Sequence, residues 1–294
     1  MRVMVIGSTG VLGVPAVRRL LADGHDVSGL AREESRVAAV RATGAKPVLG
    51  DVFDVESLTA ALRGHDAVLN LATRIPDAKH AARTSGWAEN DRLRTEGART
   101  LAAAVRAVDE LAIVVQEGVS LVYADGGDAE LGEDAPLDAR FPASSSLEAH
   151  AAVAGLEADG RTAVRLRIGT LISADPMTTA MLTAARRGSP LIMGSRDAWT
   201  TAIHPADAAA AAVAALRAPS AVYNVGATPV RKQQLGAALA VAAGVSRPRA
   251  LPRWAARLFG PTEVLSRSHR VVSDRLADAT GWRPEKPVPG PDWF

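Results

Sequence analysis

Apolar residues in the first half of the chain alternate between two spacings. Short β-branched runs, of which RVMVI at residues 2–6 is the first, predict buried strands. Between them lie alanine-rich stretches with apolar positions at helical spacing, such as VPAVRRLLADG at residues 14–24. Further strands are expected at 26–30, 46–50, 66–72, 111–116, 162–168 and 220–226, and further helices at 34–43, 55–62, 88–107, 144–159 and 202–218. This alternation predicts an α/β fold with a parallel sheet and crossover helices.

The pattern also predicts how the chain is divided. Residues 123–143 are rich in Asp, Gly and Pro and read as an irregular loop. The regular alternation fades after residue 168. We therefore expect a doubly wound Rossmann domain from residues 1–168 with 201–225. A smaller substrate-binding lobe is expected from residues 169–200 with 226–294.

Composition narrows the function classes. The 294 residues carry 34 Lys and Arg against 32 Asp and Glu, a net charge of +2, and the short basic clusters are not interleaved with aromatics. Nucleic-acid binding is therefore not expected. The chain has no cysteine, and its six histidines show no metal-ligand spacing, so no metal is expected. Neither a signal peptide nor an apolar run of membrane-spanning length is apparent. The expected protein is cytoplasmic, makes no membrane contact and acts on a small molecule.

The turn after the first predicted strand carries a glycine motif. Gly7, Gly10 and Gly13 in VIGSTGVLG have the G-x-x-G-x-x-G spacing and lie between a strand and a helix. Glycines let the backbone approach a pyrophosphate, and the helix N-terminus directs N–H groups at the anion. The alternative is a glycine turn that only packs. The predicted cofactor-binding residues of this loop are Gly7, Ser8, Thr9, Gly10, Val11, Leu12 and Gly13.

The end of the second predicted strand indicates the cofactor. A carboxylate there would bind the ribose diol of NAD, but this chain has none at the strand end and Arg32 directly after it. A guanidinium can pair with a 2′-phosphate, so NADP(H) is favoured over NAD(H). The alternative is a solvated arginine at a helix start. Asp51, after the third strand, is placed to accept from the adenine amine or to cap the following helix.

A series of short motifs covers nearly the whole chain. They are GSTGVLG, GDVFD, DAVLNLAT, ENDRLRTEGARTLAAAV, SLVYADGGDAELGEDAPL, RLRIGTLI, AIHPADAAAA, YNVG and ATGWRP. In this order they resemble the extended short-chain dehydrogenase/reductase superfamily, in its NAD(P)-dependent epimerase/dehydratase-like branch. The resemblance implies a seven-stranded Rossmann domain with substrate held between it and the C-terminal lobe. It further implies that the glycines line the pyrophosphate, that Asn90 is a structural residue, and that the cofactor is also lined by Asp51, Val52, Leu71, Ala72 and Thr73.

The chain departs from that family at the catalytic positions. The family's Tyr-x-x-x-Lys pair aligns with Pro142 and Ser146, and the family's Ser or Thr aligns with Val119, one place before Ser120. Proline cannot donate a proton, and serine cannot lower the pKa of a phenol as an ammonium group does. The chain therefore resembles an atypical member with a different site or none.

Three residues near the expected site are candidates to replace the lost groups. Glu117 ends an apolar strand and would act as a general acid or base, unless it simply pairs with an arginine. Tyr123 would donate to a carbonyl, unless it is a packed aromatic. Ser120 is the remaining candidate, although its register points to the other face of the strand.

Other residues are expected to line the substrate cleft. They are Arg74, Trp87, His150, Gly169, Thr170 and Trp199. Trp87 and Trp199 would form walls for a flat or apolar substrate, with ordinary core packing as the alternative. His150 would titrate near neutrality in the cleft, unless it is a simple exposed histidine.

Three functions remain open from the sequence. The first is an NADP(H)-binding oxidoreductase that acts on a small organic metabolite with a non-standard acid. The second is a non-redox lyase, isomerase or cyclase on the same scaffold, and the third is a non-catalytic NADP(H) sensor. By analogy with the resembling family, a homodimer would form through the helices at 88–107 and 144–159.

Overall fold

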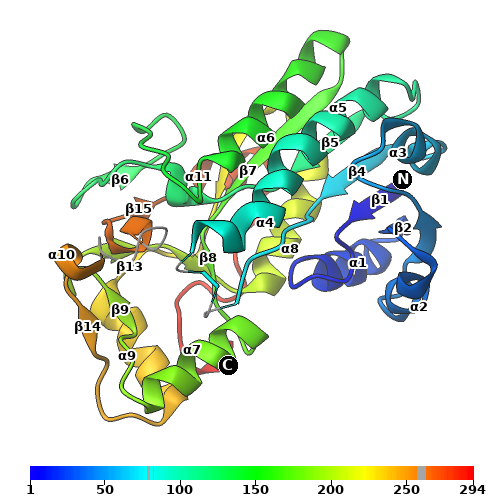
Figure 1. Cartoon of the computed structure of the whole chain (residues 1–294). Coiled ribbons are helices and arrows are strands. Elements are labelled where there is room, and N and C mark those ends of the chain that lie inside the picture. The colour runs from blue at the N-terminus through cyan, green and yellow to red at the C-terminus, as the bar shows by residue number, and fades with distance from the viewer. Residues whose placement is uncertain (78–79, 82, 257–262) are drawn as a thin grey trace.

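The core of the molecule is a single parallel sheet. The computed structural model describes residues 1–77, 80–81, 83–256 and 263–294. Seven strands pair in the order β12-β7-β5-β4-β1-β2-β3, as Figure 1 shows. Their bounds are β1 Arg2–Ile6, β2 Asp26–Ala31, β3 Lys46–Leu49, β4 Ala67–Asn70, β5 Ile113–Gln116, β7 Thr162–Ile168 and β12 Ala221–Val225. The predicted Rossmann fold is confirmed, and the strand order reverses between β1 and β4, where such sheets bind their ligands.

Helices cover both faces of the sheet. One face carries α1 Gly13–Ala22, α2 Glu34–Ala42 and α8 Pro205–Ala214, which share an apolar core with the sheet. The other carries α3 Val55–Leu62, α5 Ala98–Arg106 and α6 Ser145–Ala154, with a second core. Strands buried on both faces need nearly continuous apolar runs, which explains why they could be recognised in the sequence.

The predicted long helix at 88–107 has a more detailed form. A 3₁₀ turn at Thr84–Trp87 leads into α4 Ala88–Arg92, a π-helical turn at Leu93–Gly97 and then α5. A π turn adds one residue to the helix and is often found at functional sites. The predicted helix at 144–159 ends earlier, because α6 gives way to a 3₁₀ segment at Gly155–Asp159. The homodimer through these helices stays a prediction.

A smaller unit, called the lobe below, is built from the described residues within 176–200 and 226–271. It contains α7 Pro176–Arg186, β9 Ile192–Met193, β10 Trp199–Thr200, β13 Val230–Arg231, α9 Lys232–Ala243, β14 Ala250–Leu251, α10 Arg253–Ala256 and β15 Arg270–Val271. Figure 1 shows the lobe at the end of the strands where the glycine loop and the short strand β8 (Thr170–Leu171) also lie. Leu239 of the lobe belongs to a buried apolar cluster that also contains Ile172 and Trp293, which lie just outside these ranges.

The chain crosses between the sheet and the lobe more than once. After β7 it forms β8, which pairs in parallel with β11 Ala202–Ile203. Between β8 and β11 it passes through the lobe from α7 to β10, then continues into α8 and β12, returns to the lobe, and reaches α11 Asp274–Thr280, which packs against β12. Asp207 of α8 fastens the tail by accepting hydrogen bonds from the backbone N–H of Glu285 (2.9 Å) and of Lys286 (3.0 Å).

Among the described residues, no helix is both long enough and apolar enough to cross a membrane. In the same part of the chain, no group of three or more His, Asp or Glu side chains is arranged to hold a metal ion.

Candidate active site

The glycine loop packs directly on the end of β4. Gly7 has a positive φ of 84°, and a Cβ placed on it would lie 2.8 Å from both Cα and N of Ala72. A Cβ on Gly13 would overlap the carbonyl oxygen of Gly7. The loop is closed by a hydrogen bond of 3.0 Å from the N–H of Gly10 to that same carbonyl. Glycine is therefore required at these positions so that the backbone can make these close approaches.

The helix that follows this loop is open to an anion at its N-terminus. Leu12 occupies the N-cap and forms no side-chain hydrogen bond, and the first turn of α1 holds no acidic residue. The side-chain oxygen of Ser8, beneath the loop, is buried and has no partner among the described residues. A free helix N-terminus over a glycine turn is the arrangement that binds a pyrophosphate, so the residues present fit a dinucleotide.

The other predicted cofactor residues lie on the same edge of the sheet. Thr9 and Val11 are exposed on the loop, and Leu12 is buried beneath it. Leu71 is buried and Ala72 half-buried where β4 ends, and Thr73 is exposed. The structure thus brings the β1–α1 loop and the end of β4 together.

Arg32 and Asp51 follow β2 and β3. Arg32 is exposed and forms no ion pair with any described carboxylate, while the nearby Glu33 pairs with Arg36 at 3.9 Å. Asp51 accepts a hydrogen bond from the N–H of Phe53 (2.9 Å). The helix-cap alternative for Asp51 is wrong, because Asp54 caps α3 by accepting from the N–H of Ser57. Val52 is half-buried beside Asp51.

Glu117, the first catalytic candidate, is held in a buried ion pair. Its two oxygens accept from Nε and Nη2 of Arg94 at 2.9 and 2.8 Å, and both side chains are 3% exposed. Arg94 belongs to the π-helical turn and lies four residues after Asn90. Since both carboxylate oxygens are occupied, the geometry favours the structural alternative for Glu117.

Tyr123, the second candidate, is fully buried. Its hydroxyl donates to Oδ1 of Asn224 on β12 and accepts from Nη1 of Arg167 on β7, both at 2.7 Å. Burial raises the pKa of this hydroxyl, and the nearby Arg167 offsets part of the rise. This contact pattern favours the packed-aromatic alternative over a proton donor in a cleft.

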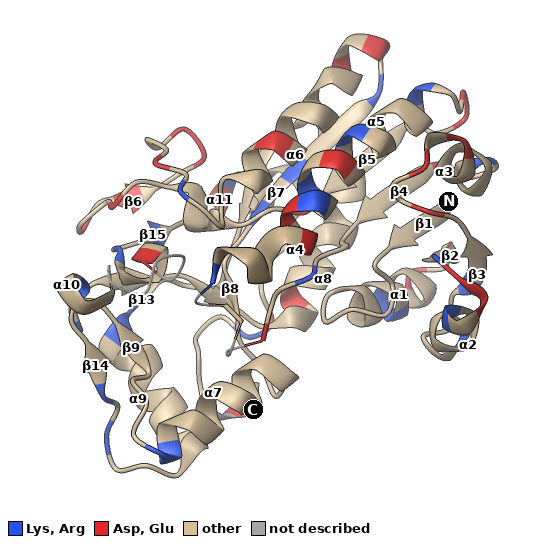
Figure 2. Cartoon of the chain, viewed as in Figure 1, with Lys and Arg blue, Asp and Glu red and all other residues tan. Residues whose placement is uncertain are grey.

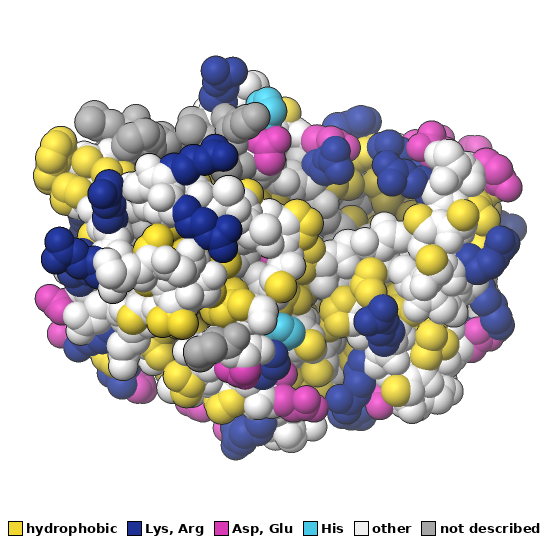
Figure 3. All heavy atoms as spheres, turned by 90° about the horizontal axis from the view of Figure 1, so that it is seen from below, with side chains coloured by type: hydrophobic (Ala, Val, Ile, Leu, Met, Phe, Trp, Pro, Cys, Tyr) yellow, Lys and Arg dark blue, Asp and Glu magenta, His cyan; other side chains and the backbone are white. Residues whose placement is uncertain are grey.

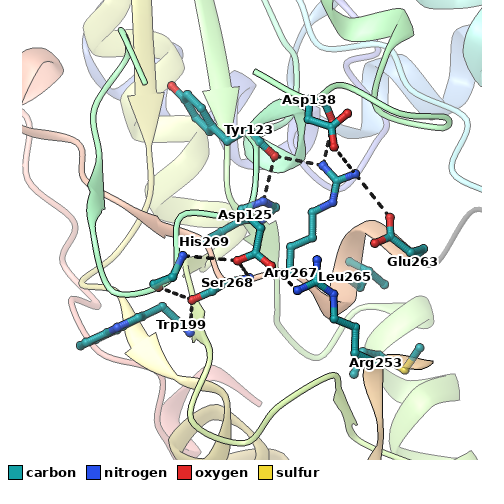
Figure 4. Close-up of polar contacts among 12 residues, drawn as sticks. Tyr123, Asp125, Asp138, Trp199, Arg253, Glu263, Leu265, Arg267, Ser268 and His269 are labelled. Atoms are coloured by element: carbon teal, nitrogen blue, oxygen red, sulfur yellow. Dashed lines mark hydrogen bonds and ion pairs between the residues drawn. The ribbon is translucent and has the colours of Figure 1, made fainter. Parts of the chain in front are cut away.

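The lobe holds the backbone of Tyr123 as well, as Figure 4 shows. Arg267 donates from Nη1 to the carbonyl oxygens of Tyr123 (3.2 Å) and Asp138 (2.7 Å). Nε2 of His269 lies 3.1 Å from the same Tyr123 oxygen, and burial lowers the pKa of His269 to about 4. The sheet therefore holds the hydroxyl of Tyr123, and the lobe holds its backbone carbonyl.

The remaining catalytic positions also lack an accessible proton donor. Ser120 is 2% exposed and begins a 3₁₀ turn at Ser120–Val122. Ser146 is fully buried on α6, and its hydroxyl has no partner among the described residues. Pro142 lies just before the start of α6 and has no side-chain donor.

His150 lies between α6 and the sheet and not in an open cleft. It is 5% exposed, and a Cβ on Gly118 would overlap its Nε2 atom. Burial, followed by the charges of Arg167, Arg165 and Arg94, lowers the pKa of His150 to about 3. The prediction of a cleft histidine that titrates near neutrality is wrong, and so is the exposed alternative, because the side chain is buried. The sequence could not show this, since it does not reveal how closely α6 approaches Gly118.

An aromatic pair lies beside the position of the missing tyrosine. The rings of Trp87 and Phe141 meet edge to face, with centroids 6.5 Å apart, and Phe141 immediately precedes Pro142. Trp87 is half-buried, and its Nε1 donates to the carbonyl of Ala81 (2.9 Å). Trp87 was predicted as a cleft wall. Its partner Phe141 was missed, although its position next to Pro142 was a usable signal.

Three further cleft candidates lie at the sheet edge. Arg74 is exposed and pairs with Glu89 at 3.4 Å, and its N–H donates to Oδ1 of the buried Asn90 at 3.0 Å. The latter bond gives Asn90 the structural role that the resemblance implies. Gly169 is buried, and a Cβ there would lie 2.7 Å from the carbonyl of Thr201, while Thr170 is half-buried in β8.

Trp199 is engaged within the lobe. The guanidinium groups of Arg231 and Arg270 lie 4.1 and 4.6 Å from the centroid of its ring, and its Nε1 donates to Asp128 at 2.9 Å. These contacts tie β10 to the loop after Tyr123, so this side chain supports the lobe. Figure 3 shows the face below the sheet edge, where hydrophobic side chains run between the lobe on the left and the sheet domain on the right.

Comparison with known proteins agrees with this geometry. Residues 3–226 match the NAD dependent epimerase/dehydratase family. A 3-diazoavenalumate denitrifying reductase from a Streptomyces species is 32% identical, over 98% of this chain and 97% of its own. Among solved structures, the human epimerase family protein SDR39U1 with NADPH has a TM-score of 0.79 at 24% identity and covers 99% of this chain and 97% of its own. The Thermus thermophilus UDP-glucose 4-epimerase complex with NAD has a TM-score of 0.74 at 22% identity, over 97% and 94%.

Both the family match and the full-length reductase relative extend over the glycine loop and the sheet edge described above. They support an NAD(P)-dependent enzyme of the oxidoreductase type, with a nicotinamide cofactor as its partner. The chain therefore belongs to the NAD dependent epimerase/dehydratase family of extended short-chain dehydrogenases/reductases.

Proposed function

We propose that the protein is an NADP(H)-dependent reductase whose substrate is an aromatic diazo compound. The observation that carries this proposal is that none of the described residues at the family's catalytic positions, and neither candidate replacement, is an accessible proton donor. Pro142 and Ser146 replace the usual pair, and the candidate replacements Glu117 and Tyr123 are fully engaged in buried contacts.

The chemistry of such a substrate fits this site. Reduction of a carbonyl creates an alkoxide that must be protonated, which is the task of the missing tyrosine. When bound, NADPH supplies a hydride, and an aryl diazonium ion plus a hydride gives the arene and dinitrogen with no proton required from the protein. The residues of the site then have to position the reactants and keep water away, and positioning alone supplies a large part of a rate enhancement.

Two features support an aromatic substrate. Trp87 and Phe141 present an aromatic surface where the family has its tyrosine. The full-length relative is named for the reductive removal of nitrogen from a diazo compound. For the cofactor, the exposed and unpaired Arg32 supports NADP(H), since a guanidinium can bind a 2′-phosphate through two hydrogen bonds.

The test uses NADPH deuterated at C4 on either face, with a benzenediazonium salt as the probe. We expect one NADPH oxidised per dinitrogen released, and deuterium in the arene from only one of the two labelled cofactors. NADPH free in solution would transfer from both faces alike, which separates the enzymatic reaction from background. Trp87→Leu should slow turnover, and Trp254→Leu, which alters a tryptophan that is 70% exposed on α10, serves as the matched control.

Each other outcome has a distinct meaning. Turnover of ketones but not of the diazonium salt would refute the substrate and leave the reductase. Conversion of a substrate with no NADPH consumed would favour the lyase, isomerase or cyclase alternative. Binding of NADPH with no turnover of any substrate would favour the sensor.

A further inference from the structure

The far end of the lobe contains a groove lined by arginines. It measures about 860 Å³ and lies between the C-terminal ends of α7 and α9 and the loop before β14. Five arginines line it, and no acidic residue does among the described residues: Arg186, Arg187, Arg196, Arg247 and Arg249. Figure 2 shows the same imbalance, because the lower left end of the lobe carries blue segments and no red ones.

The guanidinium groups of these arginines form few hydrogen bonds with the described residues. Arg186, Arg196 and Arg249 each donate one hydrogen bond to a backbone carbonyl, at 2.9, 3.0 and 3.2 Å respectively. Arg187 and Arg247 are exposed, and their guanidinium groups form no hydrogen bond or ion pair with any described residue. Most guanidinium N–H groups in the groove therefore point to no protein acceptor.

Neither the nearby helix ends nor the overall composition accounts for this concentration of positive charge. Two helix C-termini end at the groove and attract cations, but together they amount to roughly one negative charge against five positive ones. The overall composition does not explain it either, since the chain has a net charge of only +2. Residues 226–262 contain no Asp or Glu at all. Like charges held this close repel one another, and a bound polyanion would relieve the repulsion.

The shape and lining of the groove select among possible anions. Arginine binds phosphate through paired hydrogen bonds, and five arginines exceed what one carboxylate needs. Among the described residues no aromatic side chain lines the groove, so this lining lacks the stacking surface typical of single-stranded nucleic-acid sites. Its volume lies in the range of small-molecule sites. Its lining residues do not include the β1–α1 loop, and in Figure 1 the α7 and α9 helices that border it lie in the lobe, away from that loop, so it is not the cofactor site.

We infer that this groove binds a small ligand carrying two or more linked phosphate groups, independently of the catalytic site. The inference does not depend on the proposed diazo substrate. A ligand there would contact α7 and α9, the helices that build the lobe over the sheet edge.

The test is isothermal titration of the full chain, saturated with NADP+, with sodium tripolyphosphate. We expect one site per chain, weakened by at least about tenfold in the double variant Arg187→Ala/Arg247→Ala, because the loss of even one charge-assisted pair costs about tenfold in affinity. The double variant Arg18→Ala/Arg41→Ala removes two exposed arginines elsewhere and matches the change in net charge. It should leave the affinity within about twofold, as expected of screened surface charges.

Two results would overturn the inference. The first is a failure to bind with the specificity proposed. Either tripolyphosphate does not bind, or both double variants weaken it equally, in which case only general surface charge attracts it. The second is tighter binding of a single-stranded oligonucleotide that depends on Arg187 and Arg247, which would make the groove a nucleic-acid surface.

Discussion

Arg94 and Glu117 face each other across 23 residues of sequence as a bidentate ion pair with almost no solvent exposure. Removing one partner of such a pair leaves the other charge buried and unpaired. We expect Glu117→Gln and Arg94→Met each to lower the free energy of unfolding by about 3 to 5 kcal/mol in urea titrations. The apolar double variant Arg94→Met/Glu117→Leu should lose less than the sum of the two. If Glu117→Gln kept wild-type stability and lost turnover, Glu117 would be catalytic instead.

Tyr123→Phe separates a structural tyrosine from a catalytic one. The variant leaves Oδ1 of Asn224 and Nη1 of Arg167 without the hydroxyl between them, so the free energy of unfolding should fall by about 1 to 3 kcal/mol. Turnover at a temperature where both proteins are folded should not change. Tyr223→Phe, which removes a hydroxyl bonded to the carbonyl of Pro219, is the control. A large loss of kcat confined to Tyr123→Phe would contradict this assignment.

The glycine loop makes a prediction about cofactor affinity. A methyl group on Gly13 would overlap the Gly7 carbonyl, so Gly13→Ala has to displace the loop. We expect the Kd for NADPH, followed by tryptophan quenching, to rise by about tenfold or more, because the pyrophosphate contacts depend on this backbone. Gly132→Ala is the control, since its added Cβ would have nothing within 4 Å. Unchanged affinity in Gly13→Ala would mean that the loop is only a packing turn.

Arg32 is the residue that tests the proposed preference for NADP(H). Arg32→Ala should raise the Kd for NADPH by about tenfold, equivalent to roughly 1.4 kcal/mol, and leave the Kd for NADH unchanged. Arg36→Ala, one turn further along, is a suitable control because Arg36 already pairs with Glu33. Equal weakening of both cofactors by Arg32→Ala would refute the preference for NADP(H).

The buried His150 predicts a pH dependence of stability. Its pKa of about 3 in the folded protein lies below the ordinary value of 6.5. Between about pH 3 and pH 6.5 the unfolded chain therefore binds the proton more readily than the folded protein does. Its contribution to stability is therefore present above about pH 6.5 and is lost as the pH falls toward 3. Between pH 7 and 5 the loss is about 2 kcal/mol for this residue. His150→Gln should remove that part of the slope in urea titrations at several pH values, and an unchanged slope in this variant would contradict the assignment.

The sequence predicted the features that depend on local patterns. Each of the seven strands was recognised within a few residues of its bounds, the inner ones because buried parallel strands are apolar on both faces, although the edge strand β3 has no buried residue. The glycines of the first loop were recognised because close backbone approaches admit no other residue.

The sequence did not reveal which side chains meet across the fold. Glu117 forms an ion pair with Arg94, and Tyr123 accepts a hydrogen bond from Arg167, because elements that are distant along the chain pack together. The burial of His150 depends on how closely α6 approaches Gly118, which no periodicity encodes. The π-helical turn at Leu93–Gly97 also has no distinct sequence pattern, although it carries Arg94.

The division of the lobe between residues 176–200 and 226–271 has a consequence for protein engineering. Because β11, α8 and β12 are inserted between these two segments and belong to the sheet side, the lobe is not a contiguous cassette. Grafting a new specificity from a relative requires that both segments be exchanged together, along with their matching contacts to the loop at Tyr123. Exchanging only the C-terminal segment would leave α7 without its own partner helix α9, so such chimeras should fold poorly even between close relatives.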